Sequence, residues 1–123
     1  MKLIALLACA LLLACEKDPA SNEPEPNYYS VPNPPSETWL ESSSDSSGNM
    51  GIIFHWKDNS NNEDGFELYI FDAYRRTYQW KVSENSTEAN SLDRGYHINA
   101  YNIQRMRSFN RGGWSEWVEC RFR

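Results

Sequence analysis

Hydrophobic and polar residues alternate with a period of two along four stretches of the chain, 50–56, 66–71, 96–100 and 118–123. This period places every second side chain on one face of an extended strand, and the β-branched and aromatic residues favour half-buried strands. The inward sets are Met50, Ile52, Phe54 and Trp56 in the first stretch, Phe66, Leu68 and Ile70 in the second, and Val118, Cys120 and Phe122 in the last. The pattern therefore predicts strands that each bury one face.

Clusters of Ser, Asn, Asp and Gly separate these stretches at 42–49, 58–65, 83–90 and 110–113. Such clusters are typical of turns. No ten-residue stretch beyond the N-terminal segment shows a convincing helical repeat of 3.6 residues. Several short strands at this spacing predict an all-β fold, an antiparallel β-sandwich.

The N-terminus has the composition of a targeting segment. Lys2 precedes twelve apolar residues, 3–14, and the charged residues 16–18 follow Cys15. A membrane-spanning helix needs about 20 apolar residues, so this run is too short to cross a bilayer. A basic residue, a short apolar run and small residues together predict a secretory signal peptide.

The motif 12–15 (Leu-Leu-Ala-Cys) resembles the lipobox of bacterial lipoproteins. The resemblance implies a signal peptide of residues 1–14, a diacylglyceryl group on the Cys15 thiol, and an acyl chain on the new N-terminus. Two or more such chains anchor a protein stably to a membrane. The earlier motif 6–9 has the same form, but cleavage there would leave too short an apolar core.

The lipobox implies a location in the cell envelope, on the outer membrane. Residues 16–18 (Glu-Lys-Asp) resemble the surface-export signals of Bacteroidetes lipoproteins, which would place the protein on the cell surface. The same residues are equally well explained as solvated residues of a tether. The periplasmic and the surface location therefore both stay open.

All six prolines lie between residues 19 and 35, among Ser, Asn and Glu. Proline fixes φ and has no N–H to donate, so this stretch favours extended backbone. We assign 15–33 to the lipidated Cys and a Pro-rich tether, and 34–123 to the folded domain. Tyr28 and Tyr29 interrupt the tether and would dock on the domain or on a neighbouring molecule.

The sequence 56–69 (WKDNSNNEDGFELY) resembles the strand-B Trp, the B–C loop and strand C of bacterial fibronectin type III domains. Residues 96–102 (YHINAYN) are similar to strand F of that family, and residues 114–117 (WSEW) to the start of strand G. The resemblance implies an immunoglobulin-like sandwich of seven strands in two antiparallel sheets over residues 34–123.

The resemblance also implies which residues form the centre of the core. Trp56 would be the core Trp of strand B, packed under Leu92 and Tyr96, and the period of two adds Leu68 to this core. The chain departs from the family pattern here, because Leu92 to Tyr96 spans only four positions and lacks the usual Pro. Tyr96 can still fill the core.

The chain shows no constellation typical of catalysis. His55 and His97 fall on the outward phase of strands that the resemblance assigns to opposite sheets, so they cannot share a metal ion. There is no Gly-x-Ser-x-Gly elbow and no Gly-rich phosphate loop. Cys120 shares the inward phase and would behave as a small apolar residue. We expect no catalytic activity, no metal and no cofactor.

The acidic loop 58–64 suggests calcium at first sight. An EF-hand needs Gly at loop position six and Glu at position twelve. With Gly65 at position six, Phe71 occupies position twelve, so the spacing fails. We expect instead that Asp58, Asn59 and Ser60 cap a turn through their own backbone, and that Glu63 and Asp64 are solvated.

Charge is unevenly distributed along the 123 residues. The chain carries a formal net charge of −5, which disfavours nucleic-acid binding because phosphate affinity depends on clustered Lys and Arg. Residues 15–72 contain twelve acids and two bases, whereas 73–123 contain five acids and nine bases. The second half therefore offers the basic side chains for recognition.

One candidate surface is the F–G connection, 104–113, which the resemblance places in a loop. It carries Arg105, Arg107 and Arg111 together with Phe109. A positive loop with an exposed aromatic ring suits an acidic protein or a glycan. The alternative is a solvated hairpin whose Arg side chains stack on their neighbours.

A second candidate surface is an aromatic sheet face. The outward phase of strands C and F would present Tyr69, Phe71, Tyr101 and Ile103, with Tyr78 and Trp80 on the strand between them. An exposed apolar patch of this kind marks an interaction surface. Alternatively, Trp114-Ser115-Glu116-Trp117 resembles the WSxWS element of cytokine-receptor domains, which implies a structural stack of Trp with Arg105 and Arg107.

These features favour a lipid-anchored interaction or adhesion module without catalytic activity, which binds a protein or glycan partner. The alternative is a structural or spacer subunit of an envelope complex, for secretion or for polysaccharide uptake. An enzyme is disfavoured because no residue set supports one. Fold alone does not decide between the two remaining hypotheses.

Overall fold

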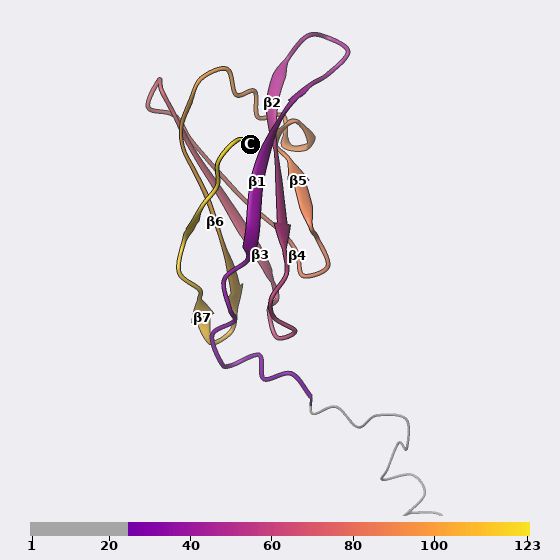
Figure 1. Cartoon of the computed structure of the whole chain (residues 1–123), viewed down its shortest axis with the longest axis vertical. Helices are drawn as coiled ribbons and strands as arrows, with labels where there is room; N and C mark the ends of the chain where they lie inside the picture. Colours follow the sequence, from indigo (N-terminus) through magenta and orange to yellow (C-terminus); the bar gives the residue numbers. More distant parts are fainter. Residues whose placement is uncertain (1–24) are drawn as a thin grey trace, which may run out of the picture.

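The computed structural model describes residues 25–123 and shows two antiparallel β-sheets packed face to face (Figure 1). The predicted all-β sandwich is therefore confirmed. The predicted signal peptide 1–14, the lipobox Cys15 and the tether as far as residue 24 lie outside the described residues. No helix within residues 25–123 is long and apolar enough to cross a membrane.

One sheet has three strands and the other has five. The three-stranded sheet has the order β1 (Ser36–Ser44), β2 (Met50–Lys57), β5 (Glu88–Asn90). The other begins with β4 (Thr77–Ser83), β3 (Gly65–Asp72) and β6 (Tyr101–Asn110), and its edge is formed by β7 (Gly113–Trp114) and β8 (Val118–Glu119), which both pair with β6. The last strand is thus split into two short segments.

The core lies between the sheets, where the period of two places it. Ile52 and Phe54 of β2 face Leu68 and Ile70 of β3, and all four are fully buried. Met50 is the exception among the predicted inward residues. It is the first residue of β2 and remains 38% exposed.

The aromatic contacts of the core differ from those that the family resemblance implies. Trp56 is buried, but its ring packs against Phe66, with 5.2 Å between the ring centroids. Tyr96 packs on Trp80 instead, at 5.5 Å. Leu92 lies beside Gly51, near the other end of β2. The prediction that Trp56 packs under Leu92 and Tyr96 is therefore wrong.

The predicted strand 96–100 is also absent: a short 3₁₀ turn, η1 (Ser91–Arg94), is followed by irregular chain as far as β6. The Asn90 side chain caps this turn by accepting from the Leu92 N–H (3.0 Å), and Gly95 ends it with φ of 72°. The chain then crosses between the sheets, where the Ile98 N–H donates to the Met50 carbonyl. The turn fills the short Leu92 to Tyr96 spacing without the usual Pro.

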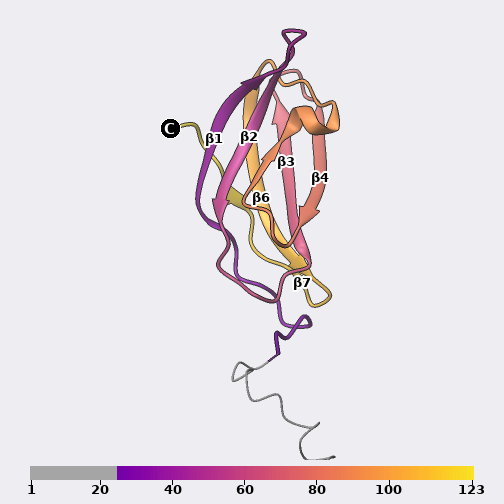
Figure 2. The same ribbon diagram turned by 90° about the vertical axis from the view of Figure 1, so that its right-hand side faces the viewer.

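The C-terminal segment connects the two sheets. The Cys120 N–H donates to the Gln104 carbonyl of β6 (2.8 Å), and the Arg121 carbonyl accepts from the Leu40 N–H of β1 (2.9 Å). Figure 2 shows the chain ending beside β1. Cys120 is buried as predicted, and burial raises the pKa of its thiol to about 11. Phe122, predicted to face inward, is 38% exposed because the chain leaves the sheet after Glu119.

Residues 27–33, which we name the strap, lie against the end of the sandwich near β7 (Figure 1). The Asn62 side chain donates to the Asn27 and Ser30 carbonyls (both 2.9 Å), and Asn110 also donates to Ser30. The Gly112 N–H donates to the Tyr28 carbonyl (3.2 Å), and a Cβ at residue 112 would collide with the next carbonyl, that of Tyr29. The end of the tether is therefore fixed to the domain.

We expect Asn110→Ala to release the strap. The Asn110 amide is 8% exposed and donates to two carbonyls, of Ser30 and Asn62. Loss of these bonds leaves polar groups unpaired at a cost of about 1–3 kcal/mol. Urea denaturation should show this loss, and limited proteolysis should cleave the strap faster. Asn102→Ala, an exposed Asn on the same strand, should change neither measurement.

Candidate functional site

The outer face of the five-stranded sheet carries a stack of alternating aromatic and guanidinium groups, which we name the Trp–Arg ladder. Its members are Trp114, Arg107, Trp117, Arg105 and Tyr69. The Arg107 guanidinium lies 3.8 Å from the Trp114 ring centroid and 4.0 Å from that of Trp117. Arg105 lies 4.5 Å from both Trp117 and Tyr69. The structure thus contains the structural stack that the WSxWS resemblance implies.

The ladder covers a buried charge on the central strand β3. Glu67 is only 3% exposed, and its carboxylate accepts from the Arg107 Nη2 (3.0 Å) and from the Gln79 amide. A buried carboxylate needs such partners, because an unpaired charge in the interior is costly. The ladder is therefore a packed layer, and its Arg groups are engaged within the fold.

The predicted loop 104–113 is largely a strand. β6 extends to Asn110, so Arg105, Arg107 and Phe109 are strand residues, and the turn itself holds little more than Arg111 and Gly112. Phe109 is half-buried under Trp114 (5.5 Å between ring centroids) and has the Lys81 amine over its ring. Arg111 is exposed, near the rings of Tyr28 and Tyr29 in the strap. Most of the residues of the predicted positive recognition loop therefore lie in a strand, not in a loop.

Trp80 and Tyr78 face the core, which corrects their assignment to the exposed face. Trp80 is 6% exposed and packs edge-on against Phe54. The register pairs Trp80 with Leu68 and Tyr78 with Ile70, and directly opposite residues share a face. The sequence indicates this inward orientation, since the apolar Tyr78, Trp80 and Val82 alternate with the polar Gln79 and Lys81.

Beyond the Tyr69 end of the ladder lie three exposed apolar side chains, Tyr101, Ile103 and Phe122, which we name the C-terminal patch. They are 38–40% exposed, and the Tyr101 and Phe122 rings are 4.8 Å apart. Half-buried Phe71 is paired with Ile103 across the strands. An open cleft of about 450 Å³ adjoins the patch. Its lining residues are Ile103, Arg105, Trp117 and Glu119.

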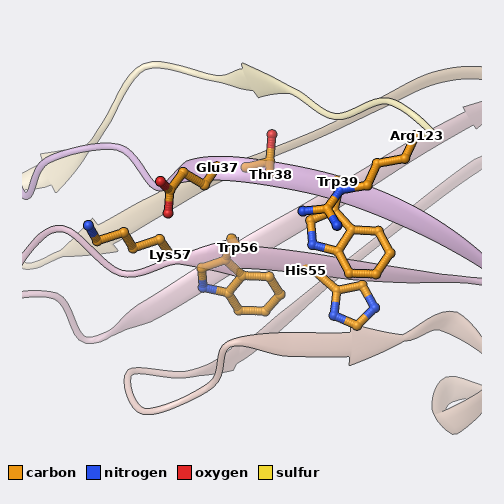
Figure 3. Close-up of a pocket in the computed structure, with 7 residues that line it drawn as sticks. All are labelled: Glu37, Thr38, Trp39, His55, Trp56, Lys57 and Arg123. Carbon is orange, nitrogen blue, oxygen red and sulfur yellow. The ribbon is translucent and has the colours of Figure 1, made fainter.

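A larger groove of about 580 Å³ follows the β1 edge (Figure 3). The alternation of hydrophobic and polar residues in the sequence does not indicate this groove. Trp39 stacks on His55 with ring centroids 3.9 Å apart, and the Arg123 guanidinium lies 4.1 Å from the Trp39 ring (Figure 3). The two ring nitrogens of His55 face Glu41 (3.0 Å) and Glu88 (3.6 Å). These groups are engaged with one another, and the stack fixes the C-terminus to the sheet.

A third cavity, of about 320 Å³, lies at the end of the sandwich that holds the strap. Three of its lining residues are acids, Asp58, Glu63 and Glu84, and Tyr28 of the strap forms part of its wall; we name it the acid pocket. The Ser60 N–H donates to Asp58 (3.0 Å), as the predicted turn cap requires. Within residues 25–123, no three His, Cys, Asp or Glu side chains are grouped to hold a metal ion.

The prediction that Glu63 is solvated is wrong. Glu63 is 5% exposed, because the loop turns its side chain into the acid pocket. Burial, a hydrogen bond with the Asp58 carboxyl and the negative charge of Glu84 together raise the pKa of Glu63 to about 7. No repeat in the sequence indicates this burial, since Glu63 lies in an irregular loop.

No family model matches the chain, and no curated protein matches it. The assignment of function therefore depends on the chain's own residues.

We expect Arg107→Ala to destabilise the domain by about 3–5 kcal/mol, because it leaves the buried Glu67 carboxylate without its ion pair. Urea denaturation measures the loss. The double variant Glu67→Gln with Arg107→Ala should recover much of it, since no charge then remains buried. Arg121→Ala removes an exposed ion pair with Glu119 and should change stability by less than about 0.5 kcal/mol. Equal losses from the two Arg variants would contradict the buried-pair account.

Proposed function

We propose that this protein is a lipid-anchored interaction module of the cell envelope, without catalytic activity, that is built on a fibronectin type III-like domain. The lipobox at Cys15 supports the anchor. The sheet arrangement supports the family, because β2 lies in one sheet while β3 and β6 lie in the other. The resemblance assigns β2 to strand B and β3 to strand C, and it places strand F, expected at 96–102, in the sheet opposite strand B. β6, which takes the place of strand F, begins at Tyr101.

The C-terminal patch carries the proposal of a binding surface. The Arg groups of the ladder are engaged within the fold, and its exposed ring, Trp114 (42%), stands alone at the far end. Tyr101, Ile103 and Phe122, by contrast, are grouped together and each remain 38–40% exposed. Exposed apolar side chains grouped on a sheet and rimmed by charged groups are typical of protein interfaces. Arg105 and Glu119 provide this rim, so we favour a protein partner over a glycan.

The anchor can be tested by substitution of each N-terminal cysteine. Cys15→Ser should move the protein from the membrane fraction to the soluble fraction and abolish incorporation of radiolabelled palmitate. Cys9→Ser is the matched control and should leave both unchanged, because Cys9 is too close to the N-terminus for a signal peptide. Retention of the palmitate label in the Cys15→Ser protein would contradict the lipobox assignment.

The binding surface can be tested by photo-crosslinking in producing cells. A photoreactive residue at Phe122 should give one discrete adduct, which Ile103→Asp removes because a charge in the patch opposes apolar contact. Tyr74→Asp, at an exposed side chain on the β3–β4 turn, should leave the adduct intact. An adduct that survives Ile103→Asp, or the absence of any adduct, would argue against this surface.

A further inference from the structure

The acid pocket concentrates negative charge without a base to balance it. Asp58, Glu63 and Glu84 all line it, and the remaining lining residues are Tyr28, Ser60, Asn61 and Asn85. None of the ion pairs within residues 25–123 involves these three acids. Arg111, which lies near Tyr28, is 5.8 Å from that ring and does not line the pocket. The pocket is therefore complementary to a positive charge.

A second, independent observation is that the Glu63 carboxyl, which lines the pocket and shares a hydrogen bond with Asp58, still has one unpaired oxygen. The Glu63 Oε2 atom is buried and has no hydrogen-bond partner in the described part of the chain. Leaving such an acceptor unsatisfied is unfavourable, and a charged donor satisfies it best. Glu63 is 5% exposed, so the loop holds this carboxyl in place at the pocket.

We propose that the acid pocket binds the guanidinium or ammonium group of a basic side chain of a protein partner. The carboxylates of Asp58, Glu63 and Glu84 would accept its hydrogen bonds, and the Tyr28 ring would contact the cation through its face. The volume of about 320 Å³ is at the lower end of the range for ligand pockets, about 300–1,000 Å³, which suits one side chain. A metal ion is disfavoured, because the described acids are not grouped for one.

This inference does not depend on the surface proposed above. The acid pocket lies at the Gly65 and Phe109 end of the β3–β6 pair, whereas the C-terminal patch lies at the opposite end, where Asp72 pairs with Tyr101. The two surfaces can therefore be tested by separate substitutions.

Binding of a cation should be linked to the proton on Glu63. The pKa of Glu63 is raised to about 7, so its carboxyl changes its charge near neutral pH. The charged groups that act on it are Asp58 and Glu84, and Tyr28 is the remaining titratable residue of the pocket. A bound cation favours ionised Glu63, so affinity should rise as pH increases through 7 and binding should release a proton.

The probe is agmatine, which carries a guanidinium and an ammonium group, added to the full-length chain in detergent micelles at physiological salt. Amide chemical shifts of Ser60, Asn61 and Asn85 should move, and the dissociation constant should fall about tenfold from pH 6 to pH 8. Glu63→Gln should remove this pH dependence, and Glu63→Gln with Glu84→Gln should weaken binding at pH 8 by about tenfold or more. Glu116→Gln, an exposed acid elsewhere, should bind as the unsubstituted chain does.

Three outcomes would overturn the proposal. If agmatine changed amide chemical shifts all over the surface, or changed them equally in the double variant, the attraction to this acidic protein would be nonspecific. Localised shifts with calcium chloride but not with agmatine would mean a metal site. Binding that appears only after Arg111→Ala would mean that Arg111 itself fills the pocket. Ile103→Asp should leave agmatine binding unchanged, so failure of the C-terminal patch does not affect this result.

Discussion

Solvent reaches neither face of most of β3, so the central strand depends on what covers its outer side. The inner side chains meet the core, but the outer Glu67 carboxylate is 3% exposed and requires a charged partner. Arg107 pairs with it, and the same planar guanidinium stacks between Trp114 and Trp117. The ion pair joins β3 to β6, and the stack extends this connection to the edge of the sheet, where β7 and β8 have only two residues each.

This arrangement decides which side chains remain for recognition. Arg and Trp are enriched among the residues that dominate binding at protein interfaces, yet here the two Arg side chains of the ladder are engaged with rings and with Glu67. The ladder leaves exposed the Trp114 ring at one end and the group of apolar side chains beyond its Tyr69 end. Ile103 lies on the same strand as Arg105, so the patch is held by a rigid element. Side chains held in this way lose little conformational freedom on binding.

Local patterns predict the fold well, whereas the candidate surfaces depend on contacts between distant segments. A period of two was sufficient to place Ile52, Phe54, Leu68 and Ile70 in the core. It failed for Phe122, because the chain bends away from the sheet to reach β1 and the alternation no longer applies. The burial of Glu63 and the stack of Trp39 on His55 have no local signal. Trp80 is different, because the alternation along its own strand, Tyr78, Trp80 and Val82 against Gln79 and Lys81, does indicate an inward side chain.

The strap gives the two ends of the molecule different roles. Asn62, Asn110 and Gly112 fix its backbone against the end of the sandwich where the acid pocket lies, and Tyr28 forms part of that pocket. If Cys15 anchors the chain, this end faces the membrane and the C-terminal patch faces away from it. Because residues 27–33 are fixed to the domain, they add no length to the proposed tether, which then consists of the residues between Cys15 and Asn27. The acid pocket would thus lie closer to the anchor along the chain than the C-terminal patch does.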